Sequence, residues 1–192
     1  MAELILAGPQ YRRSGTIRLR ITPGGFATSR EPEIRVDGGH LVTEDERIAI
    51  AGRTCRELAQ RAGVDVGAPQ GLYAEGSGVS ADETLTLDPG AAAHVAACFA
   101  IGDTALRRIG GTEAPVLWPE HFDLGISLDE INYGVSPGDA YLDEPYAYVG
   151  PWQPRRGQFW NAPFGAARAM RELAGVDTLV AFFSEGRAFA RH

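Results

Sequence analysis

The chain has 192 residues, a net charge of −7 and 22% charged residues, a balance typical of a folded globular protein large enough for one domain. The acidic charge argues against phosphate-driven binding of nucleic acid, and no apolar run approaches the roughly 20 residues that span a bilayer. All 18 basic residues are Arg, which excludes a lysine Schiff base, a lysine general base and a P-loop. We therefore expect a single domain over residues 1–192, with no nucleic-acid or membrane partner.

The N-terminus indicates a cytoplasmic protein. Residues 1–10 lack the basic segment and the long apolar stretch of a secretory signal. Cys55 and Cys98 lie far apart in helical patterns and lack the spacing of a zinc or redox motif. We expect them to be buried thiols rather than a disulfide.

The first third of the chain is predicted to be mainly β-structure. Apolar and basic residues alternate over residues 16–22, which predicts a strand with one buried face. Turns rich in Gly and Pro separate three shorter predicted strands, near residues 26–28, 33–36 and 40–43. A helix is expected over residues 50–62, ended by Gly63.

The middle of the chain predicts a long helix after a Gly-rich loop. The loop covers residues 64–80, and a short strand is expected over residues 83–87. Asp88 followed by Pro89 is a typical helix start, and the predicted helix runs to about Arg108. Its first half is rich in Ala and apolar nearly all round, which predicts the central buried helix of the fold.

The second half returns to predicted strands. Apolar residues alternate from Phe122 to Leu128, and the alternation changes phase at Asp129-Glu130, which indicates a hairpin turn or a bulge. A last strand is expected over residues 145–150. Asn161 then caps a predicted helix to about residue 174, and a second helix covers residues 178–191. The fold class is therefore predicted as α+β, a mostly antiparallel sheet packed against a central buried helix, with two C-terminal helices.

The candidate chemistry lies in the most acidic stretch, residues 109–154, which has eight acidic residues and no Arg. Strand alternation there would place His121 and Asp123 on one face, roughly 6–7 Å apart. Such a pair would serve acid/base catalysis or bind a divalent metal. The nearby carboxylates that would complete a cation site are Glu120, Asp139, Asp143 and Glu144. The alternative is a half-exposed strand that simply carries polar residues outward.

Aromatic residues gather in the same stretch. Carboxylates beside aromatic rings would bind a small or cationic ligand. The predicted ligand-binding residues are Trp118, Glu120, Tyr133, Asp139, Tyr146, Tyr148 and Trp152. The alternative is that these rings pack between sheet and helix, with their polar tips hydrogen-bonded or wet.

Short motifs in the second half carry a family resemblance. They are Phe122-Asp123-Leu124, Pro137-Gly138-Asp139, the Pro145-Tyr146-Ala147-Tyr148 segment with Pro151 after it, and Leu179 to Phe183. With these motifs, roughly residues 115–190 resemble an uncharacterised bacterial family of domains of unknown function. The resemblance implies a shared fold and no particular activity, and His121 does not map onto that family.

Three functions stay open at this point. The first is a binding protein for a small or cationic ligand, and the second is an enzyme that uses His121 and Asp123, with or without a divalent metal. The third is an interaction protein whose acidic face meets a basic partner. The first two differ in geometry, since an enzyme needs His121 and a carboxylate to converge in a concave, partly buried site. The sequence specifies neither the ligand nor the oligomeric state.

Overall fold

The computed structural model describes residues 1–72, 76–173 and 175–191. The chain divides into two compact units. The first comprises residues 1–96 and 117–122, and the second comprises residues 97–116 and 123–192. Each contains helices and antiparallel strands, so the predicted α+β class is confirmed. No helix within the described ranges is long and apolar enough to cross a membrane.

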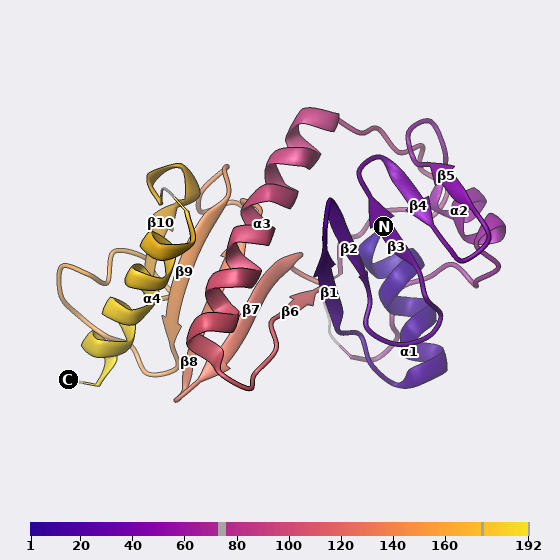
Figure 1. The fold of residues 1–192 in the computed structure, drawn as a ribbon. Coiled ribbons are helices and arrows are strands. Elements are labelled where there is room, and N and C mark those ends of the chain that lie inside the picture. The colour runs from indigo at the N-terminus through magenta and orange to yellow at the C-terminus, as the bar shows by residue number, and fades with distance from the viewer. Residues whose placement is uncertain (73–75, 174, 192) are drawn as a thin grey trace. The chain divides into compact units, whose positions relative to one another are not determined.

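The first unit begins with two helical segments and continues into a meander of short strands (Figure 1). The helical elements are η1 (Ala2–Ala7), α1 (Gly8–Ser14) and α2 (Cys55–Arg61). The strands are β1 (Leu19–Thr22), β2 (Gly25–Thr28), β3 (Arg35–Asp37), β4 (His40–Val42), β5 (Arg47–Ala49) and β6 (Val116–Trp118). β1 to β5 pair antiparallel in chain order, and β6 pairs with β1 through Leu117 and Leu19. β1 lies within residues 16–22, and β2, β3 and β4 lie at or near the other predicted strands, whereas β5 and the N-terminal helices carry no signal that we recognised in the sequence.

Helix α2 begins at Cys55, later than predicted. The Ile50 N–H still donates to the Gly39 carbonyl at 2.9 Å, which extends the strand ladder beyond β5. Thr54 then forms a capping box, because its Oγ1 accepts the Glu57 N–H at 3.1 Å and the Glu57 carboxylate accepts the Thr54 N–H at 2.8 Å. Gly63 adopts a left-handed conformation just after the helix, as its position predicted.

The second unit is built on a four-stranded antiparallel meander. Its strands, in spatial and chain order, are β7 (Asp123–Leu128), β8 (Ile131–Ser136), β9 (Tyr146–Pro151) and β10 (Ala166–Ala169). Leu128 pairs with Ile131, so Asp129 and Glu130 form a two-residue hairpin loop with φ angles of 52° and 61°. Two left-handed residues are characteristic of a type I′ turn. The predicted phase change at Asp129-Glu130 is therefore confirmed.

Two helices cover one face of this meander (Figure 1). They are α3 (Pro89–Gly110), of which residues 97–110 belong to this unit, and α4 (Val176–Ala190). Gly102 of α3 and Gly186 of α4 let the helices approach the sheet, since an added Cβ would lie 2.7 Å from Val135 and 2.9 Å from Val149, respectively. All five buried residues of α3 lie between Cys98 and Leu106. The prediction of a buried first half of this helix is therefore wrong.

The helix predicted from Asn161 to residue 174 is also wrong. The segment forms β10 and the short 3-10 helix η2 (Met170–Glu172), which leaves α4 as the single α-helix that follows β9 in the described part of the chain. The Asn161 side chain caps no helix. It accepts the Ala167 N–H at 2.9 Å and donates to the Ala167 carbonyl at 3.1 Å, so it holds β10 as a strand. Ala-rich composition favours a helix only where tertiary pairing does not compete.

Tyr133 of β8 makes a first testable prediction. Its side chain is fully buried under α4, and its hydroxyl has no hydrogen-bond partner within the described residues. Burial raises the pKa of Tyr133 to about 12. Because an unsatisfied buried hydroxyl is costly, Tyr133→Phe is expected to raise the free energy of unfolding by about 1 kcal/mol in urea titrations.

The matched control is Tyr148→Phe, which removes a phenol hydroxyl that donates to the Asp123 carboxylate. That change is expected to lower the stability by about 1–3 kcal/mol, since it leaves an acceptor without its donor. A loss of stability in Tyr133→Phe would contradict the prediction and would indicate a buried water on the Tyr133 hydroxyl.

Candidate functional site

The sheet face opposite α3 and α4 holds the polar and aromatic side chains of the second unit. Side chains alternate between the two faces of a strand. Leu124, Tyr133 and Val135 therefore point toward the helices, while their strand neighbours point the other way. The residues on this second face include Asp123, Gly125, Gly134, Ser136, Tyr146 and Tyr148.

Tyr148 lies across two glycines of the neighbouring strands. Gly125 pairs with Gly134, and Gly134 pairs with Tyr148, so the three residues form one row across β7, β8 and β9. A Cβ on Gly134 would lie 2.4 Å from Cζ of Tyr148, and a Cβ on Gly125 would lie 3.0 Å from its hydroxyl. The ring therefore occupies the space where two side chains are missing, and its hydroxyl reaches the Asp123 carboxylate.

The environment keeps Tyr148 protonated. Burial raises the pKa of Tyr148 well above its ordinary value, and the negative charge of Asp123 raises it further. The phenol is thus a neutral hydrogen-bond donor around neutral pH. It holds the Asp123 side chain at the beginning of β7 in one orientation.

A second phenol and carboxylate pair lies beside the first. The Tyr146 hydroxyl donates to the Asp139 carboxylate at 2.6 Å. Asp139 also accepts the backbone N–H groups of Tyr141 at 2.8 Å and of Leu142 at 3.3 Å. Desolvation raises the pKa of Asp139, but these hydrogen bonds outweigh it, so the pKa lies below its ordinary value and the carboxyl group stays ionised.

Two exposed rings cover the outer side of these pairs. Tyr141 is 42% exposed and Phe164 is 39% exposed, with their ring centroids 5.1 Å apart in an edge-to-face arrangement. Phe164 also lies 6.2 Å from the ring of Tyr146 and 6.4 Å from the ring of Tyr148. We call the whole set the Tyr–Asp cluster, and its members are Asp123, Asp139, Tyr141, Tyr146, Tyr148 and Phe164.

The structure brings together four of the residues singled out in the sequence: Asp123, Asp139, Tyr146 and Tyr148. Tyr133 lies on the opposite face, against Phe183 of α4. Trp152 is 60% exposed and donates from its indole N–H to Asn132 at 3.1 Å. Phe164 was missed because it falls in the segment predicted as a helix, so no sequence signal placed it beside the strands.

The remaining predicted residues lie in the first unit. The Trp118 ring faces the Arg18 guanidinium at 5.9 Å, and Glu120 is half-buried with an unsatisfied carboxylate oxygen among the described residues. His121 is exposed. The expected strand alternation fails here, because β7 begins at Asp123 and Phe122 is left-handed with a φ of 53°. His121 therefore does not share a strand with Asp123, and their joint role stays a prediction.

The predicted cation site also gains no support. Across the described ranges, no group of three or more His, Cys, Asp or Glu side chains could hold a metal ion. Glu144 forms an ion pair with Arg171. The Tyr–Asp cluster contributes two carboxylates, each hydrogen-bonded by a phenol, which suits an organic ligand better than a divalent metal.

No protein-family model, curated protein or solved structure matches this chain. The resemblance of residues 115–190 to a bacterial family therefore stays a prediction.

Proposed function

We propose that the Tyr–Asp cluster binds a small organic cation. The observation that carries the proposal is the position of two exposed rings, Tyr141 and Phe164, next to the ionised Asp139 carboxylate. A cation is attracted to the face of an aromatic ring, and a carboxylate beside the ring adds a charge-assisted contact. The chain is then a binding protein with this cluster as its recognition face.

The charges around the cluster support a cationic rather than an anionic ligand. Asp139 takes part in no ion pair within the described part of the chain, where a phenol and two backbone N–H groups donate to its carboxylate. Arg171 is paired with Glu144, and Arg168 lies over the Phe182 ring at 4.9 Å. These two basic side chains, which follow Phe164 in the sequence, are therefore engaged elsewhere.

The test is a titration with tetramethylammonium chloride, followed by the NMR shifts of the aromatic side chains at constant ionic strength. The neutral molecule of the same shape, tert-butanol, is titrated in parallel. We expect saturable binding of the cation with shifts confined to Tyr141, Phe164 and their neighbours. Asp139→Asn is expected to weaken the binding by about tenfold and Phe164→Ala by about fivefold.

Two control variants carry the same chemical changes at residues outside the Tyr–Asp cluster. Asp143→Asn removes an exposed acid from the same loop, and Phe189→Ala removes a ring on α4 that is 48% exposed. Both should bind tetramethylammonium within about twofold of the parent affinity. Equal binding of tert-butanol would contradict a cation site, as would full affinity in Asp139→Asn or the absence of any saturable binding.

A further inference from the structure

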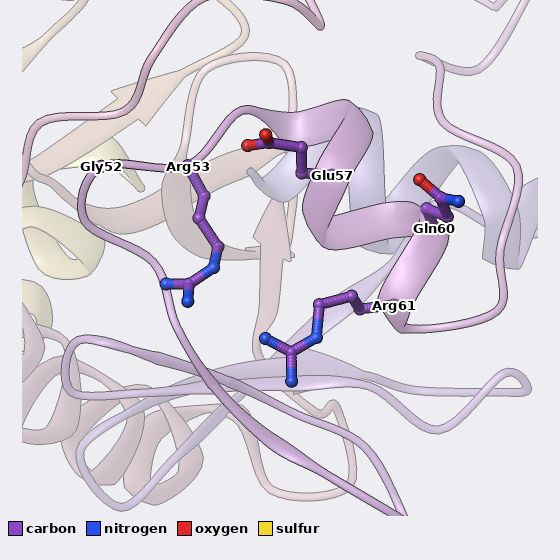
Figure 2. A pocket seen from close by; sticks show the side chains of 5 residues that line it. All are labelled: Gly52, Arg53, Glu57, Gln60 and Arg61. Carbon is purple, nitrogen blue, oxygen red and sulfur yellow. The ribbon is translucent and has the colours of Figure 1, made fainter.

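A hollow of about 490 Å³ lies against α2 in the first unit. Its lining residues are Gly52, Arg53, Glu57, Gln60 and Arg61. Figure 2 shows the guanidinium groups of Arg53 and Arg61 on one side of this hollow, with the Glu57 carboxylate nearer the beginning of α2. Two cationic side chains therefore face the same open space.

Arg53 is held in place by hydrogen bonds with backbone groups. Its Nη1 donates to the Ala49 carbonyl at 2.7 Å. Its backbone is fixed as well, because its N–H donates to the Ile50 carbonyl and its carbonyl accepts the Leu85 N–H at 2.8 Å. The residue is half-buried, and within the described part of the chain it forms no ion pair. A partly buried charge of this kind gains by binding a counter-ion.

Arg61 and Gln60 supply further hydrogen-bond donors at the hollow. Within the described residues, Arg61 donates from one nitrogen, Nη2, to Glu46 at 3.0 Å, and a guanidinium has five N–H donors. The Glu57 carboxylate is occupied by the capping box on Thr54. Gln60, at the edge of the hollow, adds a neutral amide that donates hydrogen bonds.

We propose that Arg53 and Arg61 form a binding site for a phosphate group. Two guanidiniums approaching from different residues suit a tetrahedral oxyanion, whose several oxygens accept from both, whereas a planar carboxylate is satisfied by one guanidinium fork. The ligand class is a phosphate monoester or inorganic phosphate. The site is independent of the cation site proposed for the second unit.

The probe is inorganic phosphate, titrated calorimetrically into the full chain at constant ionic strength with chloride as the balancing anion. Sodium acetate and phenyl phosphate are titrated in parallel. We expect saturable binding of phosphate and phenyl phosphate, with acetate at least about tenfold weaker. Arg53→Gln and Arg61→Gln are each expected to weaken phosphate binding by about tenfold or more. Phosphate binding without phenyl phosphate binding would identify the free ion as the ligand, and binding of both would identify a monoester site.

The control is Arg56→Gln, which removes the same charge from the same helix. The Arg56 guanidinium is held by Asp82 through hydrogen bonds of 2.6 Å and 3.0 Å, and it does not line this hollow. Its phosphate affinity should stay within about twofold of the parent value. Circular dichroism checks that each variant is folded. If Arg53→Gln does not fold, Arg61→Gln serves as the test variant, because the Arg61 side chain is 44% exposed and its replacement disturbs the fold less. Unchanged affinity in a folded variant, equal loss in Arg56→Gln, or acetate binding as tight as phosphate would overturn the proposal.

Discussion

Replacing Phe183 with Ala is expected to lower the free energy of unfolding by about 3–5 kcal/mol. Phe183 has no exposed surface, and its ring lies 5.8 Å from that of Tyr133 at an interplanar angle of 78°. It also lies 5.9 Å from the ring of Phe182. The substitution removes the apolar surface that joins α4 to β8 and leaves a cavity that the rigid sheet cannot close. Urea unfolding followed by circular dichroism gives the change in free energy.

Phe189→Ala on the same helix is the matched control. Its ring is 48% exposed and contacts Phe159 at 5.2 Å. A partly exposed ring contributes less to stability, so the expected loss is about 1 kcal/mol or less. Similar losses in both variants would mean that α4 meets the sheet through a different face of the helix.

Hairpin β7–β8 illustrates what the sequence predicts reliably. Its strands alternate apolar and polar residues, and the change of phase falls at Asp129-Glu130, where the hairpin loop lies. These signals are local, since alternation and turn position involve neighbouring residues. Asp129 is further held by Arg187 and Arg191 of the C-terminal segment, and the hydrogen bond from Arg187 lowers the pKa of its carboxyl group. Nothing in the strand pattern predicts those long-range partners.

The segment after β9 illustrates where prediction from the local sequence fails. Residues 162–174 are rich in Ala and follow Asn161, which together are typical of a capped helix. In the fold, Ala167 pairs with Tyr148 and both backbone groups of Ala167 bind Asn161. The free energy gained by adding a fourth strand and placing Phe164 beside Tyr146 exceeds a helix preference of a few tenths of a kcal/mol per residue.

The Tyr–Asp cluster was predictable in part for the same reason. The sequence indicated that acidic and aromatic residues share this stretch, and Asp123, Asp139, Tyr146 and Tyr148 do meet there. Their pairing depends on the register of three strands, which the sequence does not reveal. Tyr133 lies on the other face because it is an odd number of residues from Gly134 and Ser136, which face the cluster.

Gly134→Ala is expected to lower the stability by about 2–3 kcal/mol and to release Tyr148 from Asp123. A Cβ at residue 134 would lie 2.4 Å from the Tyr148 ring and 2.5 Å from the Leu124 carbonyl oxygen, so either the ring or the strand must move. Two measurements are made: urea unfolding gives the stability, and the absorbance of the tyrosines during an alkaline titration gives their ionisation. Folding raises the pKa of Tyr148 above 10.0, so its contribution to stability is present below that pH and is lost as the pH rises through the folded value. In the variant, the pKa of this tyrosine should fall back toward the ordinary value of an exposed tyrosine.

Gly150→Ala is the control for the same change on the same sheet face. A Cβ there would meet the Phe164 carbonyl oxygen at 3.4 Å, which is an ordinary contact, and the stability should change by less than about 1 kcal/mol. The prediction would be contradicted if Gly134→Ala were as stable as the parent and Tyr148 still ionised at the raised pH of the parent. The Tyr148 ring could then not lie over Gly125 and Gly134. Because Phe164 also contacts the Tyr148 ring, a displaced ring in Gly134→Ala should instead weaken tetramethylammonium binding together with the loss of stability.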